Sequence, residues 1–228
     1  MKSAKKSPGR KAPRSAARRV GPDAVALLKA DHRKVEGLFK KAEKAKGGAK
    51  AALVEQICQE LIIHTTIEEE IFYPACRSED VEEDKMDEAQ VEHDGAKVLI
   101  NELLDSAPDS QMYDAKIKVL SEYIKHHVKE EEQPRKGVFA EAKRKGVDVI
   151  ALGAEMKARK KELMAQAESG GLPQPDPKSI RSMRSAETGE KPSNGSAEDG
   201  GMGGRLTHFV EAAKRATVGR NVRMSAKR

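Results

Sequence analysis

The chain has 228 residues, of which 35% are charged, 37% are hydrophobic and 3% are aromatic, with no tryptophan. This composition, without runs of alternating β-branched residues, argues against a β-sandwich or barrel and predicts an all-α protein. No apolar run approaches the ~18 residues of a transmembrane helix. The basic N-terminus lacks the apolar segment of a secretory signal, so we expect a cytoplasmic protein with no transmembrane segment.

The net charge of +6 is unevenly distributed along the chain. Residues 1–19 contain eight basic and no acidic residues, and residues 205–228 contain seven basic residues and one acidic residue. Residues 20–168 carry a net charge of −7. Basic arms attract phosphate backbones, so nucleic acid is one candidate partner for residues 1–20 and 205–228. A solubilising role for the first arm, and a membrane-surface or protein contact for the second, stay open.

Composition also predicts the domain organisation. We expect a disordered basic arm over 1–21, a helical bundle with an appended helix over 22–168, and a flexible linker rich in Pro, Ser and Gly over 169–204. The remaining residues, 205–228, form a basic tail that could include one short amphipathic helix.

Four amphipathic segments follow one another between Gly21 and Pro134. In each, apolar residues recur at the 3.6-residue spacing of a helix, and one or two polar residues interrupt the stripe. The first segment begins after Asp23, a residue suited to an N-cap, and the second stops by Pro74. The four stripes are Val25, Leu28, His32, Val35 and Phe39; Ile57, Leu61, His64, Glu68 and Ile71; Met86, Ala89, His93, Ala96, Ile100 and Leu103; and Tyr113, Ile117, Leu120, Ile124, His127 and Glu131.

Helical phase selects among neighbouring polar residues in the fourth segment. His126 and His127 are adjacent, but only His127 is in phase with the apolar stripe. Of three consecutive glutamates, only Glu131 shares that face. We therefore expect His127 and Glu131 to point into the core.

Other acidic residues lie beside the stripes rather than in them. We expect four of these glutamates to be solvated: Glu69, Glu70, Glu130 and Glu132. The phase leaves open whether Asp31 and Glu92, which precede two of the histidines, hydrogen-bond to inward-facing groups or are exposed.

Six polar residues thus occupy core positions: His32, His64, Glu68, His93, His127 and Glu131. Unpaired charge is costly to bury, and mixed nitrogen and oxygen ligands without thiolate suit iron, manganese or zinc. Two carboxylates able to bridge favour a pair of metal ions, whereas a closed structural zinc site takes about four ligands. The alternative is a core in which every one of these groups is hydrogen-bonded.

Four amphipathic segments with short connections predict an up-down-up-down four-helix bundle. A short segment over 138–145 follows, and then an amphipathic helix over about 149–168 that packs along the bundle or makes an oligomer contact. Cys58 and Cys76 have no metal-motif spacing and are expected to be free thiols. The sequence leaves the oligomeric state open.

At these motifs the chain resembles the hemerythrin-like (HHE cation-binding) domain family. The resemblance covers roughly residues 22–168 and implies a four-helix bundle around a non-haem di-iron centre with two iron ions per chain. It implies terminal histidine ligands and two carboxylates that bridge. The motifs are Asp31-His32, His64-Thr65-Thr66-Ile67-Glu68-Glu69 with Phe72-Tyr73-Pro74, Glu92-His93, and His126-His127-Val128-Lys129-Glu130-Glu131.

The chain departs from the oxygen-carrying members of that family at two points. Those members have a second histidine on the third helix, four residues after the first, where this chain has Lys97. We therefore expect one metal ion to have fewer protein ligands and to be open to water, O2, peroxide or NO. The second point is Pro134, whose ring is expected to clash with the carbonyl of Glu130 and bend the helix that carries Glu131.

The resulting hypothesis is a metal-binding protein with a non-haem di-iron site that handles O2, peroxide, NO or iron as a sensor, a scavenger or a store. Manganese and zinc are less favoured metals. One alternative is a weak peroxide-decomposing enzyme that works at the open iron position. Another is a DNA-associated protein whose bundle is a scaffold and whose basic tails bind nucleic acid.

Overall fold

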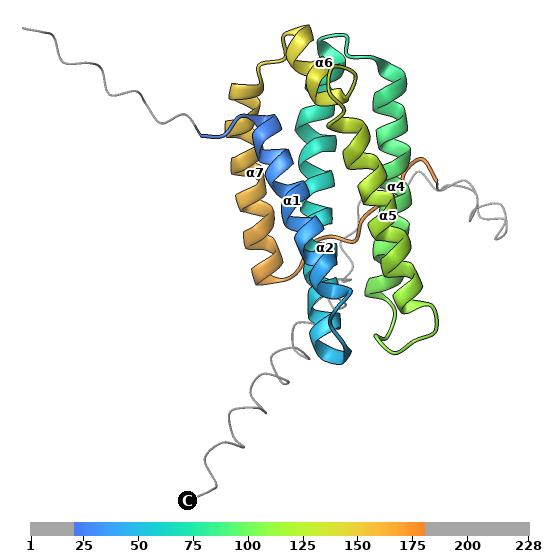
Figure 1. The fold of residues 1–228 in the computed structure, drawn as a ribbon. Helices are drawn as coiled ribbons and strands as arrows, with labels where there is room; N and C mark the ends of the chain where they lie inside the picture. Colours follow the sequence, from blue (N-terminus) through green and yellow to red (C-terminus); the bar gives the residue numbers. More distant parts are fainter. Residues whose placement is uncertain (1–20, 181–228) are drawn as a thin grey trace, which may run out of the picture.

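The computed structural model describes residues 21–180, and these residues form an all-α structure (Figure 1). Four long helices run up and down in turn and make the predicted bundle: α1 (Ala24–Ala42), α2 (Gly47–Ile67), α4 (Glu83–Leu104) and α5 (Tyr113–Glu131). The chain continues from α2 through a π-helical turn, η1 (Glu68–Phe72), into the short helix α3 (Tyr73–Ser78). The second helical segment therefore passes Pro74 instead of stopping there.

Two further helices follow the bundle. The short helix α6 (Val138–Lys145) lies at one end of it, and α7 (Val149–Ser169) packs along α1 and α2 (Figure 1). Asp23 caps α1 by accepting a hydrogen bond from the amide of Ala26 at 2.7 Å, and Asp148 caps α7 in the same way. Gly153 lets α7 approach the start of α1, since a Cβ atom there would lie 2.5 Å from the carbonyl oxygen of Pro22.

The predicted stripes form the core. All their apolar residues are buried except Ile71 and Ile124, which are half-buried. The π turn explains the first exception, because its extra residue shifts the inward face by one position after Glu68. Phe72 and Tyr73 are consequently buried in place of Ile71.

The first residues after α7 do not leave the bundle. The segment 171–180 crosses it and hydrogen-bonds to α4, where Asn101 donates to the carbonyl of Pro175 at 2.9 Å and Asp94 accepts from the amide of Ser179 at 2.6 Å. The start of the predicted linker is therefore packed. The rest of that linker and both predicted basic arms lie outside the described residues.

Two smaller features complete the fold. Cys58 and Cys76 are both buried and unbridged, as predicted. Among residues 21–180, none of the helices combines the length and the apolar character needed to cross a membrane.

Candidate metal centre

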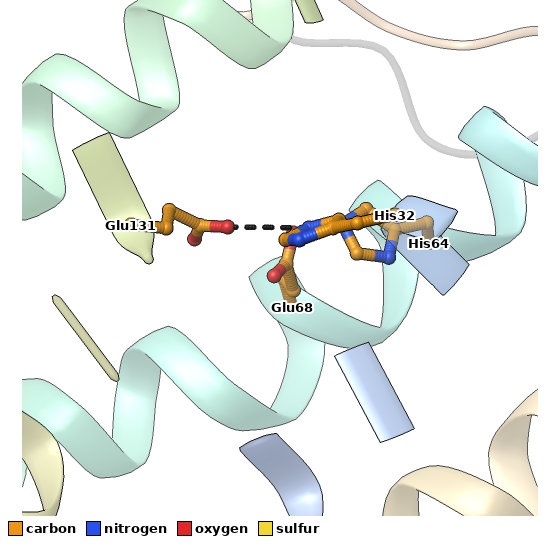
Figure 2. A group of neighbouring side chains, drawn as sticks. All are labelled: His32, His64, Glu68 and Glu131. Carbon is orange, nitrogen blue, oxygen red and sulfur yellow. Dashed lines mark hydrogen bonds and ion pairs between the residues drawn. The ribbon is translucent and has the colours of Figure 1, made fainter. Parts of the chain in front are cut away.

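Six buried side chains from the four long segments converge inside the bundle. They include every residue that the sequence analysis assigned to the metal site, and their exposure ranges from 0% to 4%. Figure 2 shows Glu131 from α5 facing His32 of α1, with His64 beside that ring and Glu68 below it. The full set is His32, His64, Glu68, His93, His127 and Glu131.

The four histidines are arranged as two pairs. The Nε2 atoms of His32 and His64 lie 3.1 Å apart, and those of His93 and His127 also lie 3.1 Å apart. The pairs come from different halves of the chain, α1 with α2 and α4 with α5. Each pair thus presents two imidazole nitrogens at one place.

The two carboxylates connect these pairs. Glu68 Oε2 lies 3.1 Å from His64 Nε2 and 3.3 Å from His93 Nε2. Glu131 Oε2 lies 3.4 Å from His32 Nε2 and 3.5 Å from His127 Nε2. Each carboxylate therefore contacts one histidine of each pair, which is the placement expected of a bridging ligand.

The outward nitrogen of every ring faces a further carboxylate. His32 Nδ1 pairs with Glu132 at 2.8 Å, His93 Nδ1 with Glu69 at 3.0 Å and His127 Nδ1 with Glu92 at 2.8 Å. His64 Nδ1 faces Asp31 at 3.7 Å, and Lys160 donates a hydrogen bond to the other oxygen of Asp31. Carboxylates in this position fix the ring orientation and the tautomer of metal-binding histidines.

These contacts leave the inward atoms in need of a cation. A ring that donates from Nδ1 to a carboxylate turns the lone pair of its Nε2 inward, so two facing Nε2 atoms require a proton or a metal ion between them. Neither oxygen of Glu68, nor Oε2 of Glu131, makes a hydrogen bond within the described residues. Buried carboxylate oxygens without partners are costly, and the mixed nitrogen and oxygen donors fit first-row transition metal ions.

The pKa values of the cluster indicate the same demand for positive charge. Burial disfavours charge on His64 and His93, but the carboxylates around them, Glu68 above all, outweigh it and raise the pKa of His64 to about 10 and that of His93 to about 9. Burial and the neighbouring His64 lower the pKa of His32 to about 4. Burial together with Glu68 raises the pKa of Glu131 to about 7. One histidine of each pair therefore holds a proton at neutral pH.

The π turn brings Tyr73 into the centre. Its hydroxyl donates a hydrogen bond to Glu131 Oε1 at 3.0 Å and lies 3.3 Å from His93 Nε2. Phe139 of α6 stacks on His32 with ring centroids 5.8 Å apart. Tyr73 was not among the residues that we predicted for the site, because a regular helix gives no reason for it to face the same way as Glu68.

Several sequence-based expectations about the surroundings need correction. Glu69 and Glu132, expected to be solvated, instead bind His93 and His32. Pro134 does not bend α5, because that helix ends at Glu131, before the proline ring could meet a helical carbonyl. Glu131 consequently keeps its inward position.

Lys97 is buried, but its ammonium group points to carboxylates rather than to the histidine pairs. It forms ion pairs with Glu69 at 2.7 Å and with Asp94 at 2.9 Å. Its Nζ also lies 3.5 Å from the carbonyl oxygen of Asp176 in the segment 171–180. Lys97 therefore supports His93 through Glu69 and offers no ligand itself.

Two cavities reach the centre from the surface. One has a volume of about 270 Å³, lies between α1 and α5, and has His32 in its wall together with apolar side chains such as Phe39, Ile124 and Val128. The other has a volume of about 150 Å³, lies between α4 and α5, and has His127 and Glu131 in its wall.

A four-helix bundle that directs histidines and carboxylates inward from facing helices has the architecture of carboxylate-bridged metal proteins. Residues 23–134 match the family model described as hemerythrin HHE cation binding domain. No curated protein matches the chain.

Among solved structures, the chain is similar to a hemerythrin HHE cation binding domain-containing protein from Mycobacterium kansasii. The TM-score is 0.55 and the sequence identity 22%, over 67% of this chain and 96% of that one, which shows a shared fold. The resemblance to the hemerythrin-like (HHE cation-binding) domain family that the motifs predicted is thus confirmed over residues 23–134.

Proposed function

We propose that the bundle binds two first-row transition metal ions, preferably iron, and handles O2, peroxide, NO or iron there as a sensor, a scavenger or a store. The observation that carries this proposal is the orientation of the four histidines. Their Nε2 atoms meet inside in two pairs 3.1 Å apart, while every Nδ1 faces a carboxylate. Without a cation, the lone pairs of these Nε2 atoms would face one another and the carboxylate oxygens, and such contacts are repulsive.

The residues divide naturally between two ions. His32 and His64 would hold one ion, His93 and His127 the other, and Glu68 and Glu131 would be shared between them. A bound iron pair supplies electrons for chemistry with O2, peroxide or NO. The carboxylates behind the rings fix their orientation, and Phe139 stacks on the ring of His32.

The cavity between α1 and α5 suits a small uncharged ligand. Phe39, Ile124 and Val128 give it apolar walls, and His32 lies at its inner end. A diatomic molecule or peroxide can therefore approach the centre along these apolar side chains, in a cavity whose wall also contains Arg33, Lys125 and Lys129.

Anaerobic reconstitution with Fe(II), followed by removal of loosely bound metal, tests this proposal. We expect wild-type protein to retain two iron ions per chain and the variant His64→Ala to lose at least one of them. The control is Glu70→Gln, which changes an exposed glutamate in the π turn after α2 that pairs with Arg159 on the outside of the bundle. Retention of two iron ions by His64→Ala would contradict the assignment.

Weak peroxide decomposition is a second candidate, and the position of Lys97 favours it. Lys97 forms ion pairs with Glu69 and Asp94 and supplies no ligand, so the His93 and His127 half of the centre would hold its ion with two histidines and the shared carboxylates, which leaves coordination positions for peroxide. We expect iron-loaded protein to evolve O2 from hydrogen peroxide and His93→Ala to lose that activity. Equal turnover by wild type and His93→Ala would exclude the buried centre as its source.

A further inference from the structure

A second cluster of metal-binding side chains lies on the surface beside the buried centre. It consists of Glu92 from α4 and of His126 and Glu130 from α5, hereafter the surface triad. We propose that the surface triad binds a first-row divalent metal ion and passes it to the buried centre. This inference rests on the proposed function, since it assigns the route by which that centre is filled.

The geometry of the surface triad suits a divalent ion. His126 Nε2 lies 3.4 Å from Glu92 Oε1 and 3.2 Å from Glu130 Oε1, and the three donor atoms all lie within 4.8 Å of one another. One imidazole and two carboxylates form a donor set that manganese, iron and zinc accept. The His126 side chain is 61% exposed, so water can complete the coordination and the ion can leave again.

Glu92 links the surface triad to the buried centre directly. While its Oε1 faces His126, its Oε2 accepts a hydrogen bond from His127 Nδ1 at 2.8 Å. An ion on the surface triad would therefore lie one carboxylate and one imidazole away from the inner His93 and His127 pair. His126 and His127 are adjacent in the sequence, and this arrangement uses both: the His126 ring is directed outward and the His127 ring inward.

An independent observation supplies the path. The cavity of about 150 Å³ between α4 and α5 has Glu92 and Glu130 of the surface triad in its wall, together with His127 and Glu131 of the buried centre. Glu131 is 1% exposed, and its Oε2 makes no hydrogen bond within the described residues. A buried carboxylate oxygen without a hydrogen bond at the inner end of the cavity is a receiving site for a cation.

The charges around the cavity favour movement of a cation inward. Glu88 adds a third carboxylate near its mouth, and Lys85 is engaged with Glu82 at 2.5 Å and Glu141 at 2.7 Å. Four carboxylates line the cavity against two lysines, Lys85 and Lys136, so the wall as a whole attracts a divalent ion. The cavity between α1 and α5 differs in this respect, because three basic side chains outnumber two carboxylates in its wall: Arg33, Lys125 and Lys129 against Glu36 and Glu132.

The first measurement is equilibrium binding of Mn(II) to the full-length chain. The protein is first loaded with zinc and desalted to remove weakly bound metal, and free Mn(II) is then followed by its electron paramagnetic resonance signal. We expect one additional Mn(II) site in wild type and about tenfold or greater weakening of it in His126→Ala, since one of three ligands is lost. Glu122→Gln is the matched control, because it removes an exposed carboxylate one turn earlier on α5.

The second measurement is the rate at which metal-free protein takes up zinc. Samples are quenched with a chelator at successive times, and the zinc that the protein retains is counted. We expect His126→Ala to load several-fold more slowly than wild type and Glu122→Gln, yet to reach the same final metal content. An unchanged loading rate, or the absence of the additional Mn(II) site despite normal zinc retention, would overturn the inference and leave the proposed function standing. Mn(II) binding at the surface triad without any retained zinc would refute the buried centre and the transfer role together.

Discussion

The hydroxyl of Tyr73 donates a hydrogen bond to Glu131 across the bundle, with 3.0 Å between the two oxygens. The contact depends on the π turn over Glu68–Phe72, because the extra residue lets Glu68 and Tyr73 both face inward. One irregular turn thus connects the two carboxylates of the centre, Glu68 through the backbone and Glu131 through this hydrogen bond.

Replacement of Tyr73 by phenylalanine should weaken metal binding while preserving the fold. The aromatic ring keeps its packing, but Glu131 Oε1 loses its hydrogen-bond donor. Loss of such a partner typically lowers metal affinity by about 10–100-fold. Competition with a chelator measures this effect, and Tyr123→Phe, at a partly exposed tyrosine away from the centre, is the control. Equal affinity in wild type and Tyr73→Phe would show that the hydroxyl does not position Glu131.

Metal uptake should release protons. His64 and His93 have pKa values of about 10 and about 9 and so are protonated at neutral pH, whereas a metal-binding imidazole must give up its inward proton. We therefore expect release of about two protons per chain on filling both pairs at pH 7.5. Calorimetric titrations in buffers of different ionisation enthalpy measure this number.

The sign of the pH dependence follows. Because the histidine pKa values are raised, protons compete with metal at neutral pH, and metal affinity should increase as the pH rises towards 9. The stability of the metal-free protein has the opposite pH dependence. The raised pKa values of His64 and His93 contribute fully to the free energy of unfolding below the ordinary histidine pKa, and this contribution is lost as the pH rises towards 9 and 10. Metal affinity that is independent of pH would contradict the assignment of these rings.

Replacement of Lys97 by methionine should destabilise the protein strongly. Lys97 is 5% exposed and Asp94 is 0% exposed, so the variant would leave buried carboxylates without their cation. Removing one member of a buried ion pair costs about 3–5 kcal/mol. Urea unfolding of the metal-free protein measures the change, with Lys125→Met at an exposed position as the control. A loss of less than about 1 kcal/mol would show that Lys97 does not hold this network.

Two glycine-to-alanine variants should have opposite effects on stability. At Gly153 an added Cβ would lie 2.5 Å from the carbonyl oxygen of Pro22, so Gly153→Ala should cost about 1–3 kcal/mol by pushing α7 from α1. At Gly37 no heavy atom lies within 4 Å of the added Cβ. Gly37→Ala should therefore stabilise α1 by roughly 0.5–1 kcal/mol. Urea unfolding measures the free energy of unfolding of both variants. Equal changes in Gly153→Ala and Gly37→Ala would contradict the close approach of α7 to α1.

Helical periodicity was sufficient to select the inward residues of the centre. His127 and Glu131 could be separated from His126 and Glu130 because only the former two continue an apolar stripe. The positions of Glu69 and Glu132 could not be predicted in this way. Glu69 lies within a π turn that no regular period contains, and Glu132 lies just beyond the last residue of α5.

Composition was misleading for the segment 171–180. Its prolines and polar residues predicted a flexible linker, yet Leu172 is buried and the carbonyl of Pro175 accepts a hydrogen bond from Asn101. Pairing of backbone groups in an extended segment with side chains of a distant helix has no local sequence signature. Only the tertiary structure reveals that α4 provides Asp94 and Asn101 as partners.

The central claim is that two metal ions occupy the buried centre, and metal content per chain tests it most directly. Elemental mass spectrometry of full-length protein, purified without added metal, should find close to two iron ions per chain. Zinc alone, or no metal, persisting after anaerobic reconstitution with Fe(II), would contradict the claim.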